Sequence, residues 1–175
     1  LAVSYQLHDV GHIADKLRRR VQRSLGGNGS AYAMARMNLF IHNVPDAQIK
    51  WGDTLANPLH LDADGNLKQF DVIVANMPFS LDKWAEGFNP GGESDGEKDK
   101  KGKDKKFKME ASHDRFHRFE MGVPPASKGD WAFLLHMLAS LKNFGRMAAV
   151  VPHGVLFRGS SEGRIRQALI QENIL

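Results

Sequence analysis

The sequence predicts an α/β fold built on a mostly parallel sheet. Two short apolar runs, at 70–75 and 147–151, flank an amphipathic segment at 130–144, and the first run is rich in β-branched residues. Such runs suit strands that are buried on both faces of a parallel sheet, and a helix is the usual connection between them. Because parallel sheets bind ligands beyond the carboxyl ends of their strands, the residues after each run are candidate site residues.

The first part of the chain predicts two helices. A basic segment with apolar residues at every fourth position predicts a helix over 13–25, and a glycine-rich break follows it. Ser30 is placed to cap a second helix that extends to about residue 42. The side chains that we expect this second helix to turn toward a core are Tyr32, Met34, Ala35, Leu39 and Phe40.

A strand and a turn are predicted ahead of the first apolar run. Residues 47–51 alternate loosely between apolar and polar, which indicates a strand. Residues 62–66 are rich in aspartate but lack the later glutamate that a calcium loop requires, so we interpret them as a turn.

Segment 89–128 has no periodicity and predicts a long, flexible loop. Within it, residues 95–108 hold seven lysines against four acids, and so account for three of the four net positive charges of the chain. A lysine run can bind phosphate backbones, but it is also the usual composition of a solvated loop, which is the interpretation that we favour.

The last part of the chain predicts a helix, a strand and a second helix. The first helix covers 130–144 and ends at Gly145, and the strand follows at 147–151. Ser160 or Ser161 is placed to cap the final helix. The residues that we expect to face inward on it are Ile165, Leu169 and Ile170.

Length and composition narrow the class of protein. A chain of 175 residues fits one domain, and no apolar run approaches the ~20 residues that a membrane-spanning helix needs. No signal peptide is visible and cysteine is absent, so we expect a cytoplasmic protein without disulfides or Cys-based zinc sites. His113 and His117 have the spacing of a zinc pair on a helix, but no third ligand accompanies them, so we expect no metal.

The clearest chemical signal is the end of the first apolar run, where Asn76, Met77, Pro78 and Phe79 follow one another. The amide oxygen of Asn76 and the carbonyl oxygen of Met77 are two hydrogen-bond acceptors. Pro78 restrains the backbone before it, and Phe79 offers a ring on which a base can stack. Two acceptors aimed at an exocyclic amino group would stabilise the positive charge that develops when its nitrogen attacks a methyl sulfonium. These residues therefore predict a site for methylating the amino group of a base.

In several blocks the chain resembles the methylation (M) subunit of type I restriction–modification systems, a family of DNA adenine-N6 methyltransferases. The matching blocks are 35–42, 52–55, 71–79, 122–125, 130–133 and 150–157. The resemblance implies a Rossmann-like class I methyltransferase core with S-adenosylmethionine as the methyl donor. It also implies that Asn76, the Met77 carbonyl and Phe79 bind the target adenine, and that Asp53, with Thr54 beside it, contacts the cofactor. The implied partners are DNA and the specificity and restriction subunits of a type I complex.

Three differences from the family pattern shape the expected domain. The glycine-rich cofactor loop and the acid that binds the cofactor ribose are not found before residue 30, and Met77 stands where the family has proline. We therefore expect residues 1–175 to form a partial methyltransferase catalytic domain with an incomplete α/β core. Whether this chain is active by itself stays open.

Two other functions stay open. An Asn-x-Pro-aromatic site also suits planar amides, so a related methyltransferase could act on protein glutamine or on RNA. A non-catalytic module that binds nucleic acid or a partner subunit is the second alternative, because part of the cofactor site is not found.

Overall fold

The computed structural model describes residues 2–6, 30–44, 47–89 and 107–174. The predicted helix over 13–25 and most of the lysine run lie outside these residues. The strands are β1 (Ala2–Gln6), β2 (Gln48–Gly52), β3 (Phe70–Asn76) and β4 (Leu141–Val150). The α-helices are α2 (Ser30–Ile41), α3 (Asp130–Ala139) and α4 (Ser160–Gln171), and the 3₁₀ turns are η1 (Glu86–Phe88), η2 (Ala111–His113) and η3 (His153–Leu156).

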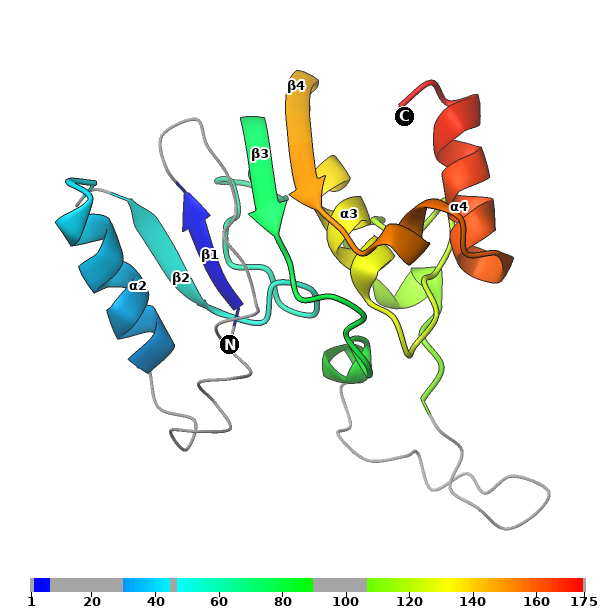
Figure 1. Cartoon of the computed structure of the whole chain (residues 1–175), viewed down its shortest axis with the longest axis horizontal. Coiled ribbons are helices and arrows are strands. Elements are labelled where there is room, and N and C mark those ends of the chain that lie inside the picture. Colours follow the sequence, from blue (N-terminus) through cyan, green and yellow to red (C-terminus); the bar gives the residue numbers. More distant parts are fainter. Residues whose placement is uncertain (1, 7–29, 45–46, 90–106, 175) are drawn as a thin grey trace, which may run out of the picture.

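The fold is mixed α/β with a small parallel sheet. Strands β3 and β4, which contain the two apolar runs, run parallel in a register that places Asn76 opposite Val150, so the expected parallel sheet is present in part. Strand β2 was expected at 47–51 and is present, but its partner is β1, which the sequence did not predict, and this pair is antiparallel. Figure 1 shows α2 beside the β1–β2 pair and α3 and α4 on the side of the β3–β4 pair.

The described elements pack around two separate apolar clusters. The larger joins β3, α3 and α4 and includes Ile73, Met77 and Ile165, whereas the smaller joins α2 to β2. On α2 the prediction was correct for Ala35 and Leu39, which are buried, and wrong for Met34 and Phe40, which are exposed. Because α2 packs mainly against one narrow strand pair, a row of residues four apart is enough to fill its contact face.

The boundary between α3 and β4 differs from the prediction. The helix ends at Ala139 instead of Phe144, and Gly145 lies inside β4 instead of ending a helix. The amide of Ser140 closes the last helical turn by donating to the carbonyls of His136 and Met137, while its own carbonyl accepts from the amide of Phe70. With this last bond the helix ends five residues earlier than the apolar periodicity indicates, and the strand begins six residues earlier.

The remaining short-range predictions are largely confirmed. The aspartate-rich turn is present, with Asp62 Oδ1 accepting from the amides of Asp64 and Asn66. Helix α4 is present with Ile165 and Leu169 buried on it as expected, but the predicted cap is wrong: the helix begins at Ser160 itself, and the residue before it, Gly159, has no side chain that could bond to the first turn. Ile170, expected to face inward, is exposed, because only one row of α4 touches the core.

Residues 107–128 pack against the core although they have no helical or strand periodicity. Met109 and Phe119 are buried, and the ring of Phe119 lies 5.3 Å from that of Trp84 and 5.9 Å from that of Phe88. Residues 107–128, which were predicted as part of a flexible loop, are therefore packed on the core, and aromatic contacts hold them in place.

Candidate functional site

The residues predicted to bind the target lie at the carboxyl end of β3. Asn76 is the last residue of the strand, and its side chain is exposed. The side chains of Met77 and Pro78 turn inward and are buried, and Phe79 is exposed again at 40% of its surface. The amide of Asn76 and the ring of Phe79 therefore lie at the surface, and the two buried residues between them anchor the backbone.

The burial of Met77 gives this loop a restraint that the sequence did not predict. Its side chain is 1% exposed and belongs to the main apolar cluster. Packing in a dense core fixes a side chain and hence the backbone that carries it. Met77 therefore restrains its own carbonyl through the core, where a proline at this position would restrain it through the ring.

The predicted cofactor residues follow β2. Asp53 comes directly after the strand, and its Oδ1 accepts from the amides of Leu55 at 2.9 Å and Ala56 at 3.0 Å. Such bonds to its own turn fix the carboxylate in place. Gly87 packs closely above it, since a Cβ at this glycine would lie 3.1 Å from Asp53 Oδ2 and 2.6 Å from the Cβ of Ala56.

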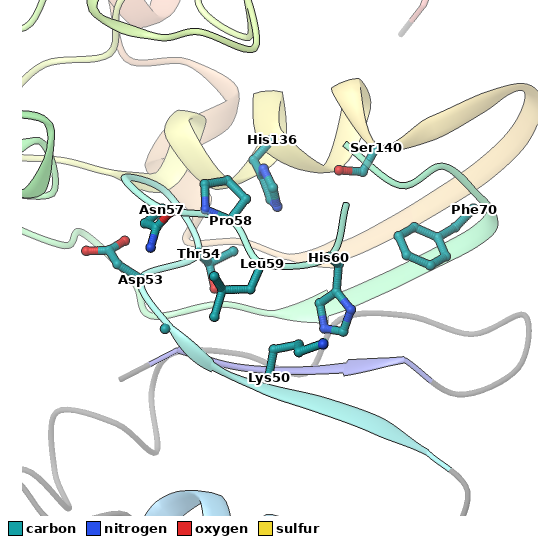
Figure 2. Close-up of a pocket in the computed structure, with 11 residues that line it drawn as sticks. Lys50, Asp53, Thr54, Asn57, Pro58, Leu59, His60, Phe70, His136 and Ser140 are labelled. Carbon is teal, nitrogen blue, oxygen red and sulfur yellow. The ribbon is translucent and has the colours of Figure 1, made fainter. Parts of the chain in front are cut away.

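Asp53 and Thr54 line a small pocket between the β2 turn, β3 and α3 (Figure 2). His136 and Ser140 contribute from α3 and its end, and Lys50 contributes from β2. The cavity holds about 20 Å³, which is enough for a water molecule but far below the ~300–1,000 Å³ of a ligand site. Asn76 and Phe79 do not line this pocket, so it does not bring the two sets of predicted residues together.

A buried polar network behind this pocket was missed in the sequence. Asp114 and Arg118 form an ion pair with Nη2 of Arg118 2.7 Å from Oδ1 of Asp114, and both side chains are only 1% exposed. Arg118 Nη2 also donates to the carbonyl of Leu55 at 2.6 Å, and Nη1 lies 3.1 Å from Nδ1 of His136. The network ties the turn that carries Asp53 to α3.

Arg118 controls the charge of its partner. Burial raises the pKa of Asp114, but the hydrogen bonds and the positive charge of Arg118 lower it by more, so its pKa lies below the ordinary 3.8. Asp114 is therefore ionised at neutral pH. The sequence signal for this pair was weak, because an aspartate four residues before an arginine is usually read as an exposed helical pair, and no helix forms here.

The two histidines of the same segment lie beside neighbouring groups of the chain. His113 Nδ1 lies 3.2 Å from the amide of Glu110, and His117 Nδ1 lies 3.0 Å from Glu120. Among the residues that the structure describes, no group of three or more metal-ligating side chains gathers. Among the described residues, no helix is long and apolar enough to span a membrane.

Comparison with known proteins identifies the family. The profile of the family described as N-6 DNA Methylase matches residues 21–175. The chain belongs to this family. The chain is also similar to curated proteins: the type I restriction enzyme MpnII methylase subunit of Mycoplasma pneumoniae is 32% identical over 154 residues, and the type I restriction enzyme HindI methylase subunit of Haemophilus influenzae is 25% identical over 150 residues.

A solved structure of the same kind agrees with the fold. The crystal structure of the type I restriction-modification system methyltransferase subunit from Streptococcus thermophilus matches with a TM-score of 0.57 at 35% identity and covers 83% of this chain. Each of these comparisons covers most of the present chain, 85% for both the Mycoplasma and the Haemophilus subunits. The chain in turn spans about a quarter of these methylases, 24%, 27% and 26% of the three proteins.

Proposed function

We propose that this chain holds the target adenine in a DNA adenine-N6 methyltransferase that takes its methyl group from S-adenosylmethionine. One observation carries the proposal: in a member of the N-6 DNA methylase family, Asn76 and Phe79 reach the surface at the end of a parallel strand while Met77 is buried between them. A flat ring beside two acceptors suits a planar base that bears an amino group.

The proposed chemistry depends on where the acceptors are directed. The lone pair of an adenine amino group is delocalised into the ring, so the nitrogen is a poor nucleophile until its geometry changes. Oδ1 of Asn76 and the carbonyl of Met77 would each accept one amino proton and stabilise the charge that develops on nitrogen. Phe79 would stack on the base, which must leave the DNA duplex to reach the site.

S-adenosylmethionine supplies an electrophilic methyl group when it is bound. Asp53 suits a role at the edge of that cofactor, because a carboxylate held by its own turn can accept from an amino group. The cavity of about 20 Å³ beside Asp53 and Thr54 is too small to enclose a nucleoside, so these residues form an edge of the site and not its envelope. We accordingly propose residues 1–175 as a partial, Rossmann-like catalytic domain.

The proposed partners follow from the relatives. The Mycoplasma and Haemophilus relatives are methylase subunits of type I restriction enzymes. By analogy, the present chain would act in the cytoplasm, on DNA, together with specificity and restriction subunits.

A chimera provides the test, with residues 21–175 replacing the matching segment of the Streptococcus thermophilus subunit in its complex. Transfer of tritiated methyl groups to DNA is the assay, and circular dichroism confirms that each variant folds. We expect Asn76→Ala to lower the rate about 10²–10³-fold. Phe79→Ala should lower it about 10–100-fold, as stacking on one base is worth ~1–3 kcal/mol.

Phe144→Ala is the matched control, because this aromatic ring is fully exposed near the opposite end of β4. It should leave the rate unchanged. Equal rates for Phe79→Ala and Phe144→Ala would contradict the stacking role. Labelling of a glutamine peptide or of RNA in place of DNA would favour the corresponding alternative substrate.

A further inference from the structure

Asp130 is the most deeply buried acid among the described residues, and its two oxygens bind two different loops. The residue begins α3 and is 0% exposed. Oδ1 accepts from the amide of Ser80 at 2.6 Å, and Oδ2 accepts from Arg158 Nη1 at 2.9 Å. Ser80 follows Phe79 in the loop after β3, and Arg158 lies in the segment that joins β4 to α4. Asp130 therefore connects the two chain segments that leave the carboxyl edge of the parallel sheet.

Helix capping does not account for this arrangement. An acid in the first turn of a helix usually satisfies the amides at that end. Both oxygens of Asp130 are directed instead to groups outside α3, one of them 50 residues earlier in the chain and the other 28 residues later. The carboxylate thus acts between elements and not within its own helix.

Arg158 holds the second loop in place. Its Nη1 lies 2.9 Å from Asp130 and 3.1 Å from Glu162, and the hydrogen bond that it donates to Asp130 is the main reason that the pKa of Arg158 is raised. The carbonyl of Arg158 accepts from Arg166 Nη2 at 2.6 Å, and Nη1 of Arg166 donates to the carbonyl of Val155. The segment from η3 to α4 is therefore fixed through both the side chain and the backbone of Arg158.

The loop after β3, which contains Ser80, has a backbone conformation that needs a restraint. Ser80 has a φ of 49°, a left-handed conformation that non-glycine residues seldom adopt and that persists where the surrounding contacts enforce it. Two bonds enforce it here, from the amide of Ser80 to Asp130 and from the amide of Gly129 to the carbonyl of Leu81. Both link the residues directly after Phe79 to the start of α3.

We infer that Asp130 and Arg158 are positioning residues that hold the Asn76–Phe79 loop in its working conformation. With Ser80 they form a unit that we call the Asp130 clamp. The inference rests on the proposed function, since it assigns a role to groups behind the proposed target-base site. The clamp sets the direction of Phe79 and of the Met77 carbonyl, while neither Asp130 nor Arg158 touches the base.

Hydrogen exchange of the full 175-residue chain, followed by mass spectrometry on the peptide that contains Ser80, tests the clamp. Asp130→Asn should raise exchange in this peptide about tenfold or more, because an amide can present its oxygen to only one of the two partners. Arg158→Gln should raise it as well, although the hydrogen bonds of the Arg158 side chain go to Asp130 and Glu162 and not to Ser80. Arg158 has a side-chain exposure of 20%, so this second variant decides the question if Asp130→Asn fails to fold.

Leu169→Ala is the matched control, since it weakens the packing of α4 without a polar contact to the loop. It should raise exchange in α4 and leave the Ser80 peptide unchanged. The clamp is refuted if Arg158→Gln raises exchange only in η3 and α4, or if Leu169→Ala affects Ser80 as much as Asp130→Asn does. No substrate is present, so these outcomes are independent of whether the chimera methylates DNA.

Discussion

Replacement of Arg118 by methionine should lower the free energy of unfolding by about 3–5 kcal/mol. Methionine can fill the space of the arginine stem, but it leaves the carboxylate of Asp114 buried without its cation. The variant also removes the donor to the carbonyl of Leu55 and the neighbour of His136 Nδ1. A loss of this size is a large part of the ~5–15 kcal/mol that stabilises a typical domain.

Urea unfolding followed by far-ultraviolet circular dichroism measures the loss. Lys142→Ala is the control, because Lys142 and Asp71 form an ion pair whose side chains are 50% and 57% exposed and which should contribute only about 0–1 kcal/mol. The double variant Asp114→Leu with Arg118→Met should recover most of the stability, since it removes both charges together. If Arg118→Met costs no more than Lys142→Ala, the account of the buried network is wrong.

Three further predictions concern the pH dependence of stability, the close packing at Gly129 and the binding of S-adenosylmethionine. Arg118 holds the pKa of Asp114 below 3.8 despite burial, so the stability that this carboxylate contributes is present above about pH 4 and is lost as the pH falls below it. Urea midpoints between pH 5 and pH 2.5 should therefore fall more steeply for the wild-type chain than for Asp114→Asn. Gly129→Ala should destabilise by about 1–3 kcal/mol, because its Cβ would lie 2.9 Å from the Cβ of Trp84. Gly163→Ala, whose Cβ would meet nothing closer than 3.6 Å, should instead be neutral or stabilising. Calorimetry of the 175-residue chain with S-adenosylmethionine should show no saturable binding at micromolar concentrations, as the Asp53 pocket of about 20 Å³ cannot enclose the cofactor; a micromolar dissociation constant would contradict this.

Much of the local structure was predictable because it depends on local signals. The apolar run at β3 and the aspartate turn before it follow from β-branching and from side-chain bonds to the backbone, and α4 follows from helix periodicity. The end of α3 was not predictable in this way. It depends on a bond between Ser140 and Phe70, two residues that are far apart in the sequence, and the apolar spacing continues past it.

The same distinction applies to the site. Asn76 to Phe79 could be found because they are consecutive and because each has a chemical property that the task requires. The residues behind them could not, since Asp130, Arg158, Asp114 and Arg118 lie in segments without a shared motif and become neighbours only in the fold. Charged residues are seldom fully buried unless they are paired, so a sequence without a contact map assigns them to the surface.

The ion pairs Asp114–Arg118 and Asp130–Arg158 share a feature that stability alone does not explain. A buried pair is often no more stabilising than apolar residues of the same volume, because desolvation offsets the attraction. Each pair here also bonds a backbone atom next to a predicted site residue: Arg118 binds the carbonyl of Leu55, two residues after Asp53, and Asp130 binds the amide of Ser80, directly after Phe79. Apolar substitutes could fill the same space, but they could not form a hydrogen bond to either backbone group. The charges therefore contribute what packing cannot, which is a fixed conformation for the two turns that carry the proposed site.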